Sequence, residues 1–205
     1  MSRLLLAVLL LGACETPPAD SDPPEVVDDG PDWTGAEPSV RADLRLKRWR
    51  QVSLDLQGAL SLTEDQICRE TGLYDCADLH AVPLGGVSIA NGIFEPVDAL
   101  SVTTGLAIER MVLQACWNRL ALDRAAEAPV VFAEIPLDGD TLEVAQAEAQ
   151  AATLYRRMLG RDPEPEERDA LVGLHAGVVE DGGGNAEWAL MSCFALGTST
   201  EALLY

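Results

Sequence analysis

Apolar positions recur at helical spacing along most of the chain after residue 41. Between residues 43 and 60, Trp49, Val52, Leu56 and Leu60 follow the helical period. The same reasoning predicts further helices at 63–72, 104–125, 141–159, from 162 to the glycine run at 182–184, and from 185 onward. The pattern therefore predicts a mostly α protein, with about five to six helices.

Capping residues and glycines mark the predicted helix ends. The expected N-caps are Thr63 (in a capping box with Gln66), Thr104, Thr141, Asp162 and Asn185, and the expected stops are Gly72 and Gly160. Pro163 and Pro165 fall in the first turn after Asp162, where proline is tolerated. In the helix after Thr104, the buried face should hold Ile108, Val112, Ala115 and Leu122.

The last long helix is apolar nearly all round from Trp188 to Leu196, and it should form the buried centre of the fold. By contrast, residues 73–102 lack a helical period and contain many turn residues, which indicates one long irregular loop or short strands. Residues 130–132 predict a single strand or a buried extended piece. The expectation is thus a single compact helical domain at 41–205.

The N-terminus has the features of a cleavable leader. Arg3 precedes an apolar run from Leu4 to Leu11, and Leu11-Gly12-Ala13-Cys14 resembles the lipobox of bacterial lipoproteins. The resemblance implies that residues 1–13 are a signal peptide and that Cys14 is lipidated after cleavage. The protein would then be anchored by lipid to a bacterial envelope membrane and would face the periplasm or the exterior. The outer membrane is favoured over the inner membrane. The alternatives are an ordinary signal peptide and an apolar N-terminus in which the cysteine occurs by chance.

Residues 14–40 predict a disordered tether between that lipid and the domain. The segment holds six of the 12 prolines and eight acidic residues, with no basic residue. Trp33 is either an exposed linker residue or a contact to the domain. The net charge of the whole chain is −20, which makes nucleic acid an unsuitable partner.

Four cysteines remain after Cys14. In an oxidising compartment they predict two disulfides, and we favour Cys68–Cys76 and Cys116–Cys193 among the three possible pairings. Buried free thiols are the alternative. A zinc site is disfavoured because no C-x-x-C motif is present, and we predict no metal and no cofactor.

Other candidate motifs have simpler structural explanations. Ser88 lies in a near match to G-x-S-x-G, with His80 or His175 as a conceivable base, but Asn91-Gly92 follows where the motif requires a helix. The acidic residues from Asp138 to Glu143 could belong to a calcium-binding loop, but helix capping explains them more simply. A basic cluster could bind phosphate or the acidic tether, or could form a solvated helix face. It comprises Arg41, Arg45, Lys47, Arg48 and Arg50.

Residues 154–205 resemble the C-terminal helical segment of uncharacterised planctomycete and myxobacterial surface proteins, which are often linked to cytochrome-containing systems. The matching residues are Tyr155, Arg156, Leu159, Gly160, Arg161, Pro163, Trp188, Glu201 and Leu203, whereas Ala202 stands where that group has phenylalanine. The resemblance covers a quarter of the chain and implies a helical module. The chain has no C-x-x-C-His motif for attaching haem.

The leading functional hypothesis is a membrane-anchored lipoprotein that acts as a non-enzymatic binding or scaffolding component of the envelope, with a protein partner. The alternatives are an extracytoplasmic hydrolase that uses the 73–102 loop and, from the resemblance alone, an accessory to extracytoplasmic electron transfer. An exposed apolar patch would favour the binding component, and a cleft lined by clustered polar groups would favour the enzyme.

Overall fold

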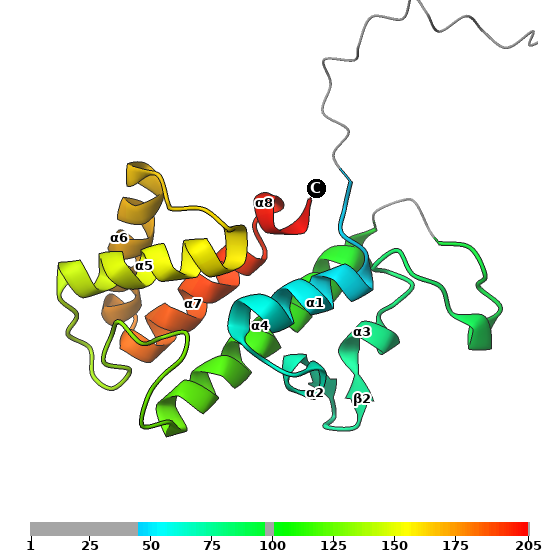
Figure 1. Cartoon of the computed structure of the whole chain (residues 1–205), viewed down its shortest axis with the longest axis horizontal. Helices are drawn as coiled ribbons and strands as arrows, with labels where there is room; N and C mark the ends of the chain where they lie inside the picture. The colour runs from blue at the N-terminus through cyan, green and yellow to red at the C-terminus, as the bar shows by residue number, and fades with distance from the viewer. Residues whose placement is uncertain (1–44, 97–100, 205) are drawn as a thin grey trace, which may run out of the picture. The chain divides into compact units, whose positions relative to one another are not determined.

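The computed structural model describes residues 45–96 and 101–204, which belong to one unit of the chain, Asp43–Tyr205. The predicted Cys14 lipid site, the tether and Arg41 lie outside the described residues. The helices are α1 (Trp49–Leu60), α2 (Glu64–Ile67), α3 (Cys76–Leu79), α4 (Val102–Ala125), α5 (Val144–Leu159), α6 (Pro165–Glu180), α7 (Asn185–Gly197) and α8 (Thr200–Leu203) (Figure 1).

The mostly α fold is confirmed. The five helices longer than ten residues are α1, α4, α5, α6 and α7, and they correspond to predicted ones. The segment expected to be a long loop or short strands, 73–102, contains in its described part the short strand β2 (Tyr74–Asp75), together with α3 and a 3-10 turn at Ile89–Asn91 that were not predicted. Strand β2 pairs with β1 (Arg69–Glu70) in a short antiparallel hairpin. None of the described helices is both long and apolar enough to cross a bilayer.

Helix α7 packs against α4, α5, α6 and α8, as expected of a central helix (Figure 1). Trp188 is fully buried, and its Nε1–H donates a 2.8 Å hydrogen bond to the carbonyl oxygen of Leu171. Met191 departs from the prediction because its position on the outer face of α7 leaves it 43% exposed. Leu122 is likewise exposed, although the period of α4 predicts that it is buried.

Several helices begin at a residue other than the predicted one. Helix α1 starts at Trp49, and the N-caps of α4, α5, α6 and α7 are Ser101, Glu143, Glu164 and Gly184. Thr104 takes part in the α4 cap as its third residue, since its Oγ1 accepts from the Ser101 N–H at 3.1 Å. Thr104 and Asp162 also bond residues outside the helices that they were predicted to cap. The Thr104 hydroxyl donates to the carbonyl oxygen of Pro83 at 2.7 Å, and Asp162 pairs with Arg156 at 2.9 Å.

The capping box of α2 is confirmed, since the Thr63 backbone N–H donates to Gln66 Oε1 at 2.9 Å. Gly72, however, does not end this helix. It lies in the turn of the β1–β2 hairpin with φ +74°, a conformation that favours glycine. Gly160 ends α5 as predicted, also with positive φ.

The segment after α4 is buried at Val131 and Phe132 as expected, but residues 130–132 form bends and not the predicted strand or extended piece. Val131 and Phe132 are fully buried without a neighbouring strand, so side chains satisfy their backbone groups. The Asp123 carboxylate accepts hydrogen bonds from the N–H groups of residues 130, 131 and 132 at 2.8–2.9 Å. Gln150 donates to the Val131 carbonyl at 3.0 Å.

Both favoured disulfides are present. Cys68–Cys76 closes the β1–β2 hairpin with a Cα–Cα distance of 5.4 Å, and Cys116–Cys193 joins α4 to α7 at 6.0 Å. All four cysteines are buried. The Cys68–Cys76 disulfide closes the hairpin that lies against α4. The Cys116–Cys193 disulfide links the two helices that contribute most to the core.

Candidate functional site

The outward face of α4 carries a row of exposed apolar side chains. Val102, Leu106, Leu113 and Trp117 are between 44% and 83% exposed. At 100° per residue, these four positions fall within a sector of about 60° on the helix. Isolated exposed apolar residues are ordinary in soluble proteins, but several on one face of a helix are typical of an interaction surface, and here exposed Glu109 and Arg110 lie between the two halves of the row. We call these four residues the α4 stripe.

Part of the α4 stripe lines an open groove with a volume of about 800 Å³. Leu106 and Leu113 contribute apolar surface from α4, and Phe194 contributes it from α7. His80 and Pro83 line the groove from the segment that follows α3. The remaining lining residues all come from α4: Thr103, Ala107, Glu109, Arg110 and Gln114.

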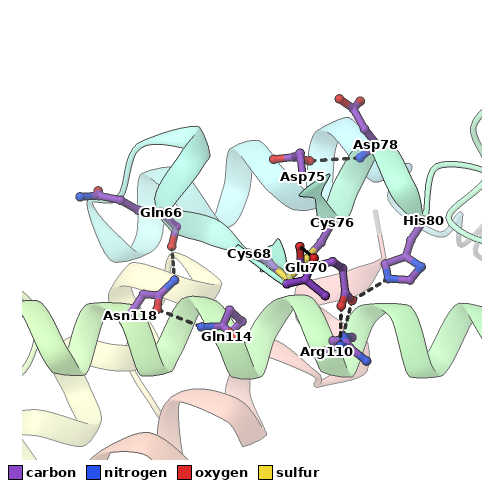
Figure 2. Close-up of a disulfide and its surroundings, with 11 residues drawn as sticks. Gln66, Cys68, Glu70, Asp75, Cys76, Asp78, His80, Arg110, Gln114 and Asn118 are labelled. Atoms are coloured by element: carbon purple, nitrogen blue, oxygen red, sulfur yellow. Dashed lines mark hydrogen bonds and ion pairs between the residues drawn. A yellow bond between two sulfur atoms is a disulfide. The ribbon is translucent and has the colours of Figure 1, made fainter. Parts of the chain in front are cut away.

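A carboxylate from the disulfide-closed hairpin organises the polar groups beside this groove. Glu70 on β1 accepts hydrogen bonds from the guanidinium of Arg110 with both of its oxygens, and from His80 Nε2 at 3.2 Å. Figure 2 shows Glu70 between these two side chains, directly above α4. The Glu70 side chain is only 12% exposed. The two potentially cationic residues of the groove therefore already have an anionic partner.

The hairpin region is also attached to α4 one to two turns further along. Asn118 Nδ2 donates to the carbonyl oxygen of Gln66 at 2.7 Å, and Gln114 supports Asn118 with a 3.0 Å hydrogen bond (Figure 2). With the Cys68–Cys76 disulfide, these contacts hold Glu70 in one place. The hairpin that carries Glu70 is thus cross-linked and hydrogen-bonded to α4, while His80 and Pro83 form the wall of the groove next to it.

The predicted catalytic candidates do not form a hydrolase arrangement. Ser88 Oγ accepts a 2.8 Å hydrogen bond from Asn91 and lies at the N-cap of the 3-10 turn, so the strand–turn–helix of a nucleophile elbow is lacking there. His80 pairs with Glu70, and His175 bonds Asn185 at 2.9 Å.

The other sequence candidates have structural partners. Asp138 pairs with Arg124, and Glu143 is the N-cap of α5, in line with the capping interpretation. Within residues 45–96 and 101–204, no group of three or more His, Cys, Asp or Glu side chains could hold a metal ion. In the basic cluster, Lys47 pairs with Asp55, and Arg50 stacks over the Trp49 ring.

The residues of the C-terminal resemblance form a structural clamp. Arg161 donates to both carboxylate oxygens of Glu167 and of Glu201, all at 2.7 Å, which ties α6 to α8. Its guanidinium carbon also lies 5.2 Å from the centre of the Tyr155 ring. Hydrogen bonds from Arg161 and then from the Glu164 backbone lower the pKa of Glu167 to about 2. The same guanidinium lowers the pKa of Glu201.

The α4 stripe and the Glu70–Arg110 pair were not predicted from the sequence. The stripe has a signal, because residues 102, 106, 113 and 117 recur at steps of four, seven and four. The buried face of the same helix also repeats at helical spacing, so the exposed row and the buried face cannot be told apart in the sequence. Glu70 and Arg110 are 40 residues apart and have no local signal.

Comparison of the chain with protein-family models, with curated proteins and with solved structures gives no match. What the groove can bind therefore has to follow from its own geometry and charge.

Proposed function

We propose that this chain is a membrane-anchored envelope lipoprotein whose helical domain is a non-enzymatic binding component, with the groove over α4 as its binding surface. The observation that carries the binding role is the α4 stripe, four apolar side chains exposed on one face of a helix. The lipobox ending at Cys14 supports the anchoring role. The two disulfides support an extracytoplasmic location.

The rigidity of the surface supports the same proposal. Helix α4 is linked to α7 by the Cys116–Cys193 disulfide, and the hairpin beside the groove is closed by the Cys68–Cys76 disulfide. A pre-organised surface loses little conformational entropy when it binds a partner. Trp117, 57% exposed at one end of the stripe, belongs to the residue type most enriched among binding hot spots.

The anchoring role is tested by replacing Cys14 with serine. The wild-type chain should be recovered in the membrane fraction after a high-salt wash, and the Cys14→Ser chain should not be, because it lacks the acylated thiol. Metabolic labelling with a fatty acid should mark only the wild type. A Cys14→Ser chain that remains in the membrane fraction would show that the anchor lies elsewhere.

The binding role is tested by site-specific photo-crosslinking in the producing cells. A photoreactive residue at Leu113 should give a discrete adduct, and the same residue at Val144, exposed at the start of α5, should give none. Trp117→Ala should abolish the Leu113 adduct. Burial of the exposed part of the indole would contribute about 3 kcal/mol, on the order of 100-fold in Kd. Equal adducts at both sites would contradict the proposal.

The hydrolase hypothesis has one observation in its favour: His80, in the 73–102 segment, lines the groove and is hydrogen-bonded to a carboxylate. This arrangement could orient a general base. Glu70 is shared with Arg110, however, and Ser88 is engaged with Asn91. Turnover of an ester or amide substrate that is lost in His80→Gln and retained in Trp117→Ala would favour the enzyme over the binding component.

A further inference from the structure

The α4 stripe has the length and the spacing of a binding site for a helix. From Val102 to Trp117 it spans 16 residues, a rise of about 22 Å or four helical turns. Its members recur at steps of four, seven and four, so they lie in one row along α4, and the apolar face of another helix can pack along such a row. The groove beside it is open and elongated along α4, with lining residues from Thr103 to Gln114.

On the basis of the proposed function, we infer that the occupant is an amphipathic helix of a different protein, which packs its apolar face on the α4 stripe and places a basic side chain beside Glu109. The charges around the groove carry this inference. Arg110 and His80 are both paired with Glu70. In the described part of the chain, Glu109 is the charged lining residue that has no ion-pair partner, and it is exposed.

A helix seated on the stripe would exclude water from one side of Glu109. A cation on that helix offsets the lost hydration, and an anion adds repulsion, so the carboxylate selects basic partners. The net charge of −13 over residues 41–205 acts in the same direction, because it attracts basic partners over longer distances.

A second copy of this chain is a poorer occupant, although the stripe is self-complementary in spacing. Its positions are symmetric about the midpoint between Glu109 and Arg110, so an antiparallel pair would match Leu106 with Leu113 and Val102 with Trp117. The same register matches Glu109 with Arg110 of the second copy, but Arg110 is already paired with Glu70 of its own chain. Both copies are also strongly acidic, and this repulsion disfavours the pair.

The test uses two synthetic amphipathic helical peptides with the same leucine face, one with lysines and one with glutamates at the flanking positions. Binding to the purified full chain is measured by fluorescence anisotropy, with a scrambled lysine peptide as the control for composition. The lysine peptide should bind about two- to fivefold more tightly than the glutamate peptide, the range of one exposed ion pair. Added salt should reduce the difference.

Glu109→Lys should reverse this preference. Glu180→Lys, the same charge change at an exposed position on α6, should leave the preference unchanged. Leu113→Asp should abolish binding of both peptides, whereas Val144→Asp, which adds the same charge to exposed apolar surface on α5, should not. Melting curves of all variants verify that they are folded.

The outcomes separate the inference from the function on which it rests. Equal binding of both peptides, unchanged by Glu109→Lys but lost in Leu113→Asp, would overturn the basic partner and leave the groove as a binding surface. Peptide binding that is unaffected by Leu113→Asp would overturn both. A dimer of the full chain in sedimentation that Leu113→Asp converts to monomer would replace the foreign helix with a second copy.

Discussion

The carboxylate of Asp123 should be the most sensitive single polar position in the domain. It is almost completely buried, and it accepts three backbone hydrogen bonds from residues 130–132. It also pairs with the buried guanidinium of Arg119 at 2.7 Å. In Asp123→Asn the shape is kept, but one carboxylate oxygen becomes an NH₂ group that faces backbone N–H donors, and Arg119 loses its counter-charge.

The expected cost of Asp123→Asn is about 3–5 kcal/mol, the loss that follows when one partner of a buried ion pair is removed. Each hydrogen bond to a charged acceptor is worth about 1.5–3 kcal/mol, so the lost acceptor oxygen alone accounts for a large part of this cost. For a domain of this size, the melting temperature should fall by roughly 6–20 °C. Urea unfolding followed by tryptophan fluorescence and circular dichroism gives the free energy of unfolding.

The matched control is Asp138→Asn. Asp138 pairs with Arg124 at 2.9 Å, but its side chain is 91% exposed, so the change should cost at most about 1 kcal/mol. Adding Arg119→Met to Asp123→Asn should recover part of the loss, because the uncompensated charge is removed. A free energy of unfolding for Asp123→Asn that lies within about 1 kcal/mol of the wild-type value, or that is no lower than that of Asp138→Asn, would refute this prediction. In either case the buried carboxylate would not hold the 130–132 segment in place.

Three further predictions concern the frame of the domain. Replacing both cysteines of the α4–α7 disulfide with alanine should cost about 4.5 kcal/mol by the loop-entropy model, against about 2.5 kcal/mol for the hairpin disulfide, because the closed loops span 77 and 8 residues. Denaturant unfolding of the two variants gives the order. Glu167 and Glu201 have lowered pKa values, so the stability from their pairing with Arg161 is fully present above about pH 4.5 and is lost as the pH falls toward 2. In Arg161→Met, the free energy of unfolding should therefore decrease less steeply over this pH range than in the wild type. Trp188→Ala should cost about 3–5 kcal/mol, and Trp188→Phe less, since it keeps most of the ring and loses the hydrogen bond to Leu171; an unchanged melting temperature in Trp188→Ala would contradict the central position of α7.

The sequence predicts the long helices and their C-terminal ends well, and their first residues less well. Helices α4 and α5 end at Ala125 and Leu159, as the pattern and Gly160 indicate. Near the N-termini, several Ser, Thr, Asp and Glu residues compete for the cap. Tertiary contacts decide among them, as where Thr104 bonds Pro83 and leaves the cap to Ser101.

The disulfide pairing could be predicted because each pair joins elements that the pattern already places together. Cys68 and Cys76 flank a short turn, and Cys116 and Cys193 lie on helices that share the core. The polar part of the site could not be predicted in this way. Glu70 meets Arg110 only because the closed hairpin lies against α4, and no local rule relates two residues 40 positions apart.

The C-terminal resemblance and the groove concern different parts of the molecule, and this limits what the resemblance can say about function. Tyr155, Arg161, Glu201 and Trp188 build the frame: a clamp across α5, α6 and α8, and a buried indole in α7. Of the groove residues, only Phe194 lies within 154–205. The resemblance therefore bears on the frame of the domain and not on the groove over α4. The proposed binding role is best tested at Leu113, Trp117 and Glu109, because these exposed residues of α4 lie outside the clamp and can be substituted without removing its contacts.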